Sequence, residues 1–384
     1  MKYKTYKIKD LINEISMGPF GSNIKVECFV DSGIPVLNGS NLTGFALNDN
    51  SFRYVTPEKA DSLGKANAYR GDIVITHRGT LGQIVFIPEN SKHSRYVISQ
   101  SQFRVKCNEK ILPEYLVYYF HTNAGQHKLL SNASQVGVPA LARASTTFQT
   151  LEIDIPDVTE QRKIVDLLET IREKIETNNA INNNLEQQVS ALYQSWFEDF
   201  EITNGVCPEN WSYQELSTIA DIASGKRPPV KSDNCNEKTP ISIVGAASVM
   251  GYTSEANHTD KILVTGRVGT HGVIQRFNTP CWTSDNTLVI TSPYYEFTNQ
   301  ILHRIDYSSM NRGSTQPLIT QGDMKKVVVL VPDEDTLAKF EKFASSLMAK
   351  WEANNNENVK LASLRDTLLP KLMSGELDVS DIEL

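Results

Sequence analysis

The sequence predicts an α+β protein with two similar, mixed β-rich globular domains and two long α-helices that pair as an antiparallel coiled coil. Three observations lead to this prediction: an internal repeat, a coiled-coil apolar period in each copy, and short β-branched runs between turn-forming residues. The expected order is a globular domain over 1–155, a helix over 156–203, a second globular domain over 204–332, and a helix with a tail over 333–384. Such a chain has a pseudo-twofold internal repeat, with one body and one arm in each copy.

The two arms are related by an offset of 176 residues, at which Ile155-Pro156-Asp157 matches Val331-Pro332-Asp333. After each match, apolar residues recur at alternating steps of four and three, the period of a coiled-coil helix. The first seam is Ile164, Leu168, Ile171, Ile175, Asn178, Asn182, Leu185, Val189, Leu192 and Trp196; the second is Phe340, Ala344, Leu347, Trp351, Asn354, Asn358, Leu361, Arg365, Leu368 and Leu372. Arg365 departs from the pattern, and we expect neighbouring Leu364 to take its place. Pro370 should end or kink the second helix about one turn early.

Asparagines interrupt both seams at matching places. In an antiparallel pair whose residue numbers sum to 536, Asn178 lies opposite Asn358 and Asn182 opposite Asn354. Facing amides can bond to one another, and buried polar residues fix the register of a coiled coil at some cost in stability. The alternative is a solvated break in each helix.

The globular segments also repeat, more loosely. Residues 73–78, followed by Gly79-Thr80-Leu81-Gly82, resemble residues 262–267, followed by Val268 and Gly269-Thr270-His271-Gly272. The two GxxG sequences are consistent with hairpin turns or with an RNA-binding KH clamp. Each follows a strand-like run, which favours hairpin turns. A helix is expected over 113–131.

Charge is distributed unevenly along the chain. The net charge of −7 divides into +4 for residues 1–155, −6 for 156–203, 0 for 204–332 and −5 for 333–384. The acidic arms would repel phosphate, so their outward faces suit protein partners, whereas the two bodies are neutral to basic and suit nucleic acid better. Trp196, Phe197 and Phe200, at the end of the first arm, either anchor such a partner or pack onto a body.

Several classes of protein are disfavoured by composition. Five cysteines without CxxC spacing indicate neither a zinc site nor a disulfide framework. No apolar run approaches the roughly 20 residues that cross a bilayer, and the first residues lack the apolar core of a signal peptide, so a cytoplasmic protein is expected.

Motifs of catalysis are missing as well. Ser224-Gly225-Lys226-Arg227 lacks the upstream glycine of a phosphate-binding loop, and there is neither an Asn/Asp-Pro-Pro-Tyr/Phe tetrapeptide nor a nuclease carboxylate cluster. His77 and His271 have no Cys, Asp or Glu neighbours at metal-ligand spacing. The sequence therefore predicts no catalytic residue and no metal site.

Three stretches resemble one known family. Gly18-Pro19-Phe20-Gly21-Ser22 resembles the opening of the specificity (S) subunits of Type I restriction-modification enzymes. The first arm, with EQRKIVDLLETIREKI from Glu160 and SWFEDF from Ser195, resembles their central conserved region, and LRDTLLPKLMSGELDV from Leu364 their distal one. One departure is Asp335-Thr336-Leu337, which stands where the first arm has Thr159-Glu160-Gln161.

The resemblance implies a non-catalytic subunit with two target-recognition domains, each reading one half of a split target in double-stranded DNA. It implies that the paired helices set the spacing of the halves and that two modification (methyltransferase) subunits dock on the chain. Restriction (endonuclease) subunits would then join. No cofactor is expected in this chain; S-adenosylmethionine, and ATP with Mg, belong on the partner subunits. No membrane partner is expected.

Candidate DNA contacts are cationic and amide side chains in the two bodies, because such groups reach phosphates and base edges. In the first body these are Lys25, Asn38, Asn41, Arg78, Lys92, Arg95 and Gln100, and in the second Lys226, Arg227, Lys231, Arg267, Asn286, Arg312 and Gln316. Two other functions remain open: a coiled-coil DNA-binding regulator that acts without enzyme partners, and a free-standing modification enzyme, which the missing motifs disfavour.

Overall fold

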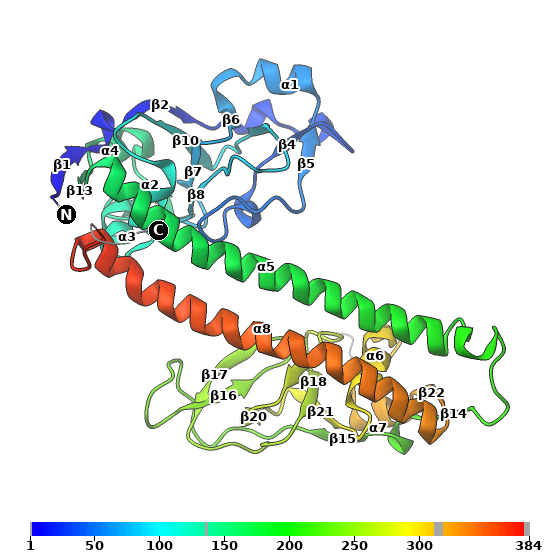
Figure 1. Cartoon of the computed structure of the whole chain (residues 1–384). Helices are drawn as coiled ribbons and strands as arrows, with labels where there is room; N and C mark the ends of the chain where they lie inside the picture. The colour runs from blue at the N-terminus through cyan, green and yellow to red at the C-terminus, as the bar shows by residue number, and fades with distance from the viewer. Residues whose placement is uncertain (1, 135–136, 311–317, 380–384) are drawn as a thin grey trace. The chain divides into compact units, whose positions relative to one another are not determined.

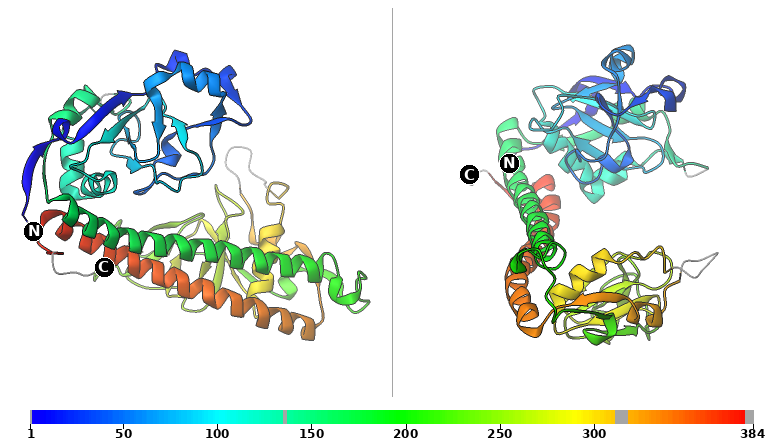
Figure 2. Two further views of the ribbon diagram at one scale, coloured as in Figure 1. Left: turned by 45° about the horizontal axis from the view of Figure 1, so that its top comes forward. Right: turned by 90° about the vertical axis from the view of Figure 1, so that its right-hand side faces the viewer.

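The computed structural model describes residues 2–134, 137–310 and 318–379, which form two compact units. Unit 1 comprises Met1–Thr177 and Asn358–Leu384, and unit 2 comprises Asn178–Glu357. The two long helices, α5 (Val158–Phe197) and α8 (Glu334–Ser374), each contribute to both units, and Figures 1 and 2 show both as continuous helices. Each unit therefore contains one globular body and a part of each long helix.

The body of unit 1 contains two main sheets. The first is antiparallel, in the order β2 (Ile12–Met17), β10 (Gln102–Cys107), β7 (Ile73–Thr76), β8 (Ile84–Phe86). The second runs β3 (Phe29–Val30), β5 (Arg53–Val55), β4 (Ile34–Val36), β9 (Arg95–Val97), β6 (Asn67–Tyr69). The remaining elements are the pairs β1 (Lys4–Lys7) with β13 (Glu152–Ile155) and β11 (Ala133–Ser134) with β12 (Ala140–Leu141), and the helices α1 (Pro57–Ser62), α2 (Pro113–His121), α3 (Asn123–Leu129) and α4 (Ala144–Thr150).

The body of unit 2 repeats this plan in a smaller form. Its antiparallel sheet runs β15 (Asp221–Ser224), β21 (Thr287–Thr291), β18 (Ile262–Gly266), β19 (Gln275–Phe277). Its second sheet runs β17 (Val249–Thr253), β16 (Ile241–Val244), β20 (Cys281–Thr283). The remaining elements are the pair β14 (Ser212–Glu215) with β22 (Val328–Val331) and the helices α6 (Tyr295–Arg304) and α7 (Gln321–Lys325). Both second sheets contain one parallel pair, β4–β9 and β16–β20.

Short 3-10 helices join these elements. They are η1 (Ile8–Asp10), η2 (Gly21–Asn23), η3 (Val26–Cys28), η4 (Gly39–Asn41), η5 (Gly64–Ala66), η6 (Glu201–Thr203) and η7 (Leu216–Thr218). Among the described residues, no helix has both the length and the apolar content needed to cross a bilayer.

The repeat of the two bodies is thus real, but the sequence alignment of their central strands was wrong by one residue. Gln102 pairs with Thr76 in unit 1, and the equivalent Thr287 pairs with Gly266 in unit 2. Thr76 therefore corresponds to Gly266 in the structure, whereas the sequence alignment had matched it with Thr265. A slip of one residue places every side chain of a strand on the opposite face, so only the structure gives the true equivalences.

Both bodies are fixed to the long helices by apolar cores. In unit 1, Ile164 and Leu168 of α5 share a core with Leu369 and Leu372 of α8 and with Phe120 of α2. In unit 2, residues from the other end of α5 meet the beginning of α8, with Tyr193, Phe197, Phe297, Phe340 and Ala344 in one core. The buried Phe197 and the half-buried Trp196 and Phe200 pack on this core, so the aromatic cluster at the end of the first arm packs onto a body.

Of the four seam asparagines, Asn178, Asn182 and Asn354 are buried in unit 2, whereas Asn358 is half-buried and belongs to unit 1. Asn354 donates a hydrogen bond of 2.9 Å to Oδ1 of Asn182, the partner expected if paired residue numbers sum to 536. The amide of Asn178 donates to Glu357 Oε2 at 2.8 Å, one residue before its predicted partner, Asn358. Asn182 also donates to Asn355 Oδ1 at 3.0 Å. These amides exchange hydrogen bonds inside the seam, and the alternative of a solvated break is wrong for Asn178, Asn182 and Asn354, which are all buried.

The structure contradicts the expected seam position of Leu364 and the expected end of the helix at Pro370, while a kink at Pro370 stays a prediction. Leu364 does not replace Arg365 in the seam: Leu364 is exposed, whereas the Arg365 guanidinium lies over the ring of Phe45, 5.1 Å from its centroid. Its long apolar stem makes this position possible. Pro370 does not end the helix, which continues to Ser374. The apolar core that buries the last turn stabilises it beyond the proline.

The helix expected over 113–131 is two helices, α2 and α3, separated at Thr122. The Thr122 hydroxyl accepts a hydrogen bond from the Gly125 backbone and so caps a new helix. A Cβ on Gly125 would lie 2.1 Å from the Tyr119 carbonyl oxygen, so the two helices meet too closely for any other residue there.

Candidate nucleic-acid interface

The loop that leaves β2 and the loop that leaves β15 occupy equivalent places in the two bodies. Each starts with a glycine, Gly18 or Gly225, whose backbone N–H donates to the first residue of the neighbouring strand, β10 or β21. A Cβ on Gly18 would lie 1.9 Å from the carbonyl oxygen of Ser99, and a Cβ on Gly225 would lie 2.1 Å from that of Ser284. Both loops therefore need glycine because the facing turn passes too close for a side chain.

The side chains that follow these glycines differ. In unit 1 they are Pro19 and Phe20, and Phe20 is 84% exposed. In unit 2 they are Lys226 and Arg227, both exposed. The indole N–H of Trp282 donates to the Lys226 carbonyl at 2.7 Å and so fixes the start of this loop. An apolar ring and two cations thus occupy corresponding positions.

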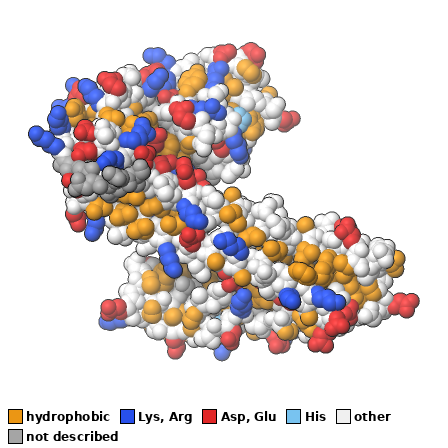
Figure 3. Space-filling view, viewed as in Figure 1, with side chains coloured by type: hydrophobic (Ala, Val, Ile, Leu, Met, Phe, Trp, Pro, Cys, Tyr) orange, Lys and Arg blue, Asp and Glu red, His pale blue; other side chains and the backbone are white. Residues whose placement is uncertain are grey.

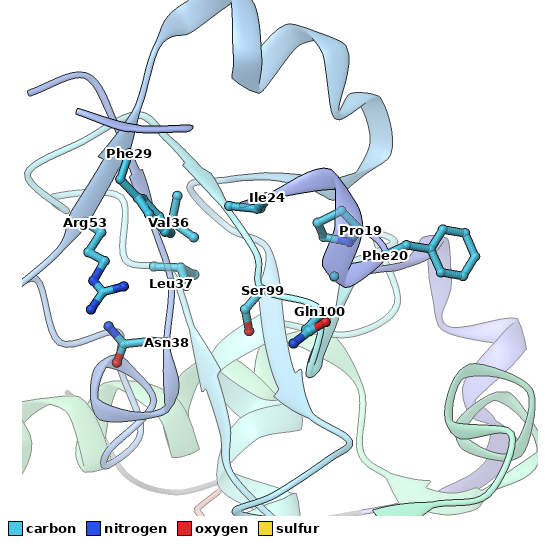
Figure 4. Close-up of a pocket in the computed structure, with 11 residues that line it drawn as sticks. Pro19, Phe20, Ile24, Phe29, Val36, Leu37, Asn38, Arg53, Ser99 and Gln100 are labelled. Carbon is cyan, nitrogen blue, oxygen red and sulfur yellow. The ribbon is translucent and has the colours of Figure 1, made fainter. Parts of the chain in front are cut away.

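Beside the first loop is a pocket of about 350 Å³ within unit 1. Its walls include the apolar side chains of Ile24, Phe29 and Val36, which pack together in one cluster. Figure 4 shows Arg53 and Asn38 on one side of these residues and Gln100 on the other. The pocket thus has an apolar floor and a polar rim.

The polar rim is held in place by local contacts. The Arg53 guanidinium lies over the ring of Phe29, 5.2 Å from its centroid, and Arg53 makes no ion pair within the described chain. Oδ1 of Asn38 accepts a hydrogen bond of 2.8 Å from the Ser40 backbone, which caps η4. The cap uses the oxygen of Asn38 and leaves its amide hydrogens for a ligand. Arg53 and Asn38 are therefore preorganised donors.

Of the predicted contacts in the first body, Asn41 and Arg95 have structural roles. Asn41 is fully buried, and its amide donates to the carbonyls of Asn48 and Asn50. Arg95 donates to Asn67 at 2.8 Å and pairs with Asp61 at 2.6 Å. Their hydrogen-bonding groups are directed inward or neutralised, which the sequence did not reveal.

The other predicted residues of the first body are on its surface. Asn38 and Gln100 line the pocket. Lys25 and Arg78 are exposed, at the start of η3 and just after β7. The exposed Lys92 donates from Nζ to the carbonyl of Asp49 at 3.1 Å. The pattern missed Arg53 and Phe20; glycine on both sides of an aromatic residue in a loop was a usable signal for Phe20.

In unit 2, Lys226, Arg227, Lys231 and Asn286 are exposed. Arg267 is half-buried, and its Nε is buried with no hydrogen-bond partner among the described residues. Its backbone N–H donates to the Asn286 carbonyl, just as that of His77 donates to the Ser101 carbonyl. Arg267 thus corresponds to His77 of unit 1 and not to Arg78. Arg312 and Gln316 lie outside the described residues.

His77, two residues before the first GxxG sequence, and His271, inside the second, both lie in the connections between paired strands. Each GxxG joins an antiparallel pair, β7 with β8 and β18 with β19, which confirms the hairpin interpretation. His77 contacts the Gln100 carbonyl oxygen at 3.2 Å, and His271 contacts that of Gly266 at 3.0 Å. Burial lowers the pKa of His77, which favours its neutral form. Within the described ranges, no three His, Cys, Asp or Glu side chains are grouped as metal ligands.

On the face shown in Figure 3, charge does not outline a DNA-binding surface. Lys and Arg side chains on this face are interspersed with Asp and Glu side chains. The candidate interface is therefore defined by the two glycine-anchored loops and the side chains around them.

Comparison with known proteins identifies the family of both segments. Residues 2–187 and 208–361 both match the family model described as the Type I restriction modification DNA specificity domain. The chain is 24% identical over 416 residues to the Type I restriction enzyme MjaIX specificity subunit of Methanocaldococcus jannaschii. This match covers 98% of this chain and 94% of the relative. It is 22% identical over 431 residues to the Type I restriction enzyme HindI specificity subunit of Haemophilus influenzae, covering 87% of this chain and 93% of the relative.

The fold is also similar to a solved structure, the S subunit of a Type I restriction-modification system from M. genitalium. The TM-score is 0.60 at 16% identity, and the match covers 97% of this chain and 96% of the other. This similarity shows a shared fold over nearly the whole chain.

Proposed function

Since this chain belongs to the Type I restriction modification DNA specificity family, we propose that it selects the DNA sequence on which a Type I restriction-modification enzyme acts. Each globular body reads one half of a bipartite duplex target. The observation that carries the proposal is the duplication of the body, with the same strand order and a glycine-anchored loop at the same place in both copies. Two non-identical readers on one chain suit a target with two non-identical halves.

The chain itself catalyses nothing in this proposal. Two modification subunits dock on it and transfer the methyl group of S-adenosylmethionine to adenine, and restriction subunits cleave DNA with ATP and Mg²⁺. The names of the two relatives support this division, because each is called the specificity subunit of a restriction enzyme.

The long helices pair antiparallel along their length and set the distance between the half-sites. Helix α5 has 40 residues, about 60 Å at 1.5 Å per residue. This length corresponds to about 18 base pairs at roughly 3.4 Å each. Because each body covers several base pairs, the unread gap should be roughly 5 to 9 base pairs.

The first experiment compares the purified chain with the chain bound to its modification subunit. The chain alone should transfer no methyl group, and the complex should methylate adenine within one split sequence, found by sequencing modified bases. Methylation by the purified chain alone would refute the proposal.

The second experiment exchanges residues 1–155 for the matching segment of a relative with another target. Only one half of the methylated sequence should change, because the other half is read by unit 2. A simultaneous change in both halves would show that the bodies do not read independently.

A further inference from the structure

The pocket of unit 1 combines two kinds of chemistry within one small volume. Its floor is apolar, with Val36 buried and Ile24 and Phe29 half-buried. Its rim carries donors: the Arg53 guanidinium and the amide hydrogens of Asn38. A ligand that matches both must present an apolar group directly beside a hydrogen-bond acceptor.

Among the base edges in the major groove, thymine has this pattern, because its C5-methyl group lies next to the acceptor O4. Cytosine presents a donor, adenine an acceptor with a donor, and guanine two acceptors without a methyl group. We propose that this pocket reads a thymine of the target, with the C5-methyl group against Ile24 and Val36 and with Asn38 and Arg53 donating to O4. This inference rests on the proposed function and adds a base identity to it.

The surroundings of the pocket favour DNA as its occupant. Residues 1–155 carry a net charge of +4. The equivalent loop of unit 2 carries Lys226 and Arg227, which suit phosphates and guanine edges. Figure 4 shows the Phe20 ring directed away from the other pocket residues, so Phe20 leaves the pocket open.

The experiment measures binding of the full chain, in complex with its modification subunit, to a duplex that contains the target sequence. This sequence is the one identified by sequencing the methylated sites. Each thymine is replaced in turn by uracil, which lacks only the methyl group. One replacement, in the half-site that changes when residues 1–155 are exchanged, should weaken binding about fourfold, the value of one buried methyl group at about 0.8 kcal/mol. The same replacement should cost less in Ile24→Ala, because this variant has already lost part of the floor.

Val26→Ala is the matched control, since Val26 is apolar, 76% exposed and close in sequence but does not line the pocket. It should keep the full loss on uracil replacement. Asn38→Asp is a second probe, because the aspartate oxygen can still cap η4 while the amide donor is lost. A carboxylate accepts from N4 of cytosine, so this variant should discriminate less against cytosine at the same position.

The outcomes separate this inference from the proposed function. If the complex binds its target specifically but tolerates every uracil, or if the exchanged half-site has no thymine, the thymine pocket is refuted while the proposed function stands. Tighter binding when the thymine is mispaired would also refute it, since it would indicate an unstacked base. A complex without any sequence preference would refute the proposed function itself.

Discussion

In unit 1 the loop after β2 exposes Phe20, whereas in unit 2 the loop after β15 exposes Lys226 and Arg227 at the corresponding place. The backbone of both loops is fixed in the same way, by a glycine against the carbonyl of the facing turn. The duplicated backbone therefore determines where each body can make a contact. The loop side chains determine what kind of contact it is.

This separation explains how one fold can serve two different half-sites. The glycines are required by the backbone of the facing turn and not by the side chains of the loop, so they need not change when the loop side chains do. Phe20, Lys226 and Arg227, by contrast, are exposed and can vary with little effect on stability. The following predictions test the equivalence of the two bodies and the difference between their loops, from the largest expected effect to the smallest.

The largest effect should come from lengthening the helices that connect the two bodies. One heptad inserted into each helix, after Asn182 and before Asn354, keeps the apolar seam in phase, preserves the contact of these two amides and adds about 10 Å. The gap in the target should grow by about three base pairs, with a rotation of roughly a third of a turn that weakens binding strongly. Sequencing of methylated sites measures the gap.

The control for this lengthening is an insertion into α5 alone. It should lower the thermal stability, because Tyr193 and Phe197 of α5, which lie beyond the insertion, could no longer pack on Phe340 of α8 while the residues before it keep their partners. An active double insertion with an unchanged gap would mean that the helices do not set the spacing.

The next effect tests the shared backbone of the two loops. Gly18→Ala and Gly225→Ala should each lower the free energy of unfolding by about 1–3 kcal/mol, because each Cβ would overlap a backbone oxygen. Gly322→Ala is the control, since its Cβ would meet only the Thr320 hydroxyl at 3.7 Å and it lies in helix α7. Chemical denaturation should show a similar loss for the first two and none for the third. A loss at only one of them would contradict the equivalence of the loops.

Much of this architecture could be predicted from the sequence because the signals were local. The seam period, the matching asparagines and the glycine-bracketed turns each depend on residues a few positions apart. The alignment of β18 with β7 was wrong by one residue because the identical residues Arg78 and Arg267 were matched in an otherwise loose alignment. The strand pairing shows that they are not equivalent.

The candidate site was predictable only in part, for a related reason. Asn38 and Gln100 have side chains suited to DNA and lie at the pocket. Nothing in the sequence places Arg53 over Phe29 or directs Asn41 inward, because these contacts depend on how strands and loops pack.

A smaller effect distinguishes the two arms by pH. At the repeat offset of 176 residues, Glu341 of α8 corresponds to Val165 of α5, which is buried. Burial raises the pKa of Glu341 to about 7. The folded state therefore holds this proton more tightly than the unfolded state, and stability falls as pH rises from about 4.5 through 7. Glu341→Gln should reduce the difference in the free energy of unfolding between pH 5 and pH 8 by about 1–2 kcal/mol, measured by chemical denaturation at both pH values. Val165→Ala, which is not titratable, should destabilise equally at both pH values.

The smallest effect is on the salt dependence of DNA binding, where the two loops should differ most clearly. A cation that neutralises a phosphate releases counterions, and each such contact contributes about 0.9 to the slope of log K against log salt. Replacing both Lys226 and Arg227 by Ala should therefore reduce the slope by about 1–2. Phe20→Ala should weaken binding without changing the slope, because an uncharged ring releases no ions.

Fluorescence anisotropy over a salt series measures both quantities on the same target. Lys325→Ala, which removes an exposed cation of unit 2 in α7, is the control and should leave the slope unchanged. Equal slopes for the Phe20 variant, the double variant and the wild type would mean that the cationic loop touches no phosphate. The difference between the loops would then lie in base contacts alone. A reduced slope in the Phe20 variant would show instead that this loop positions cations elsewhere in unit 1, such as Lys25.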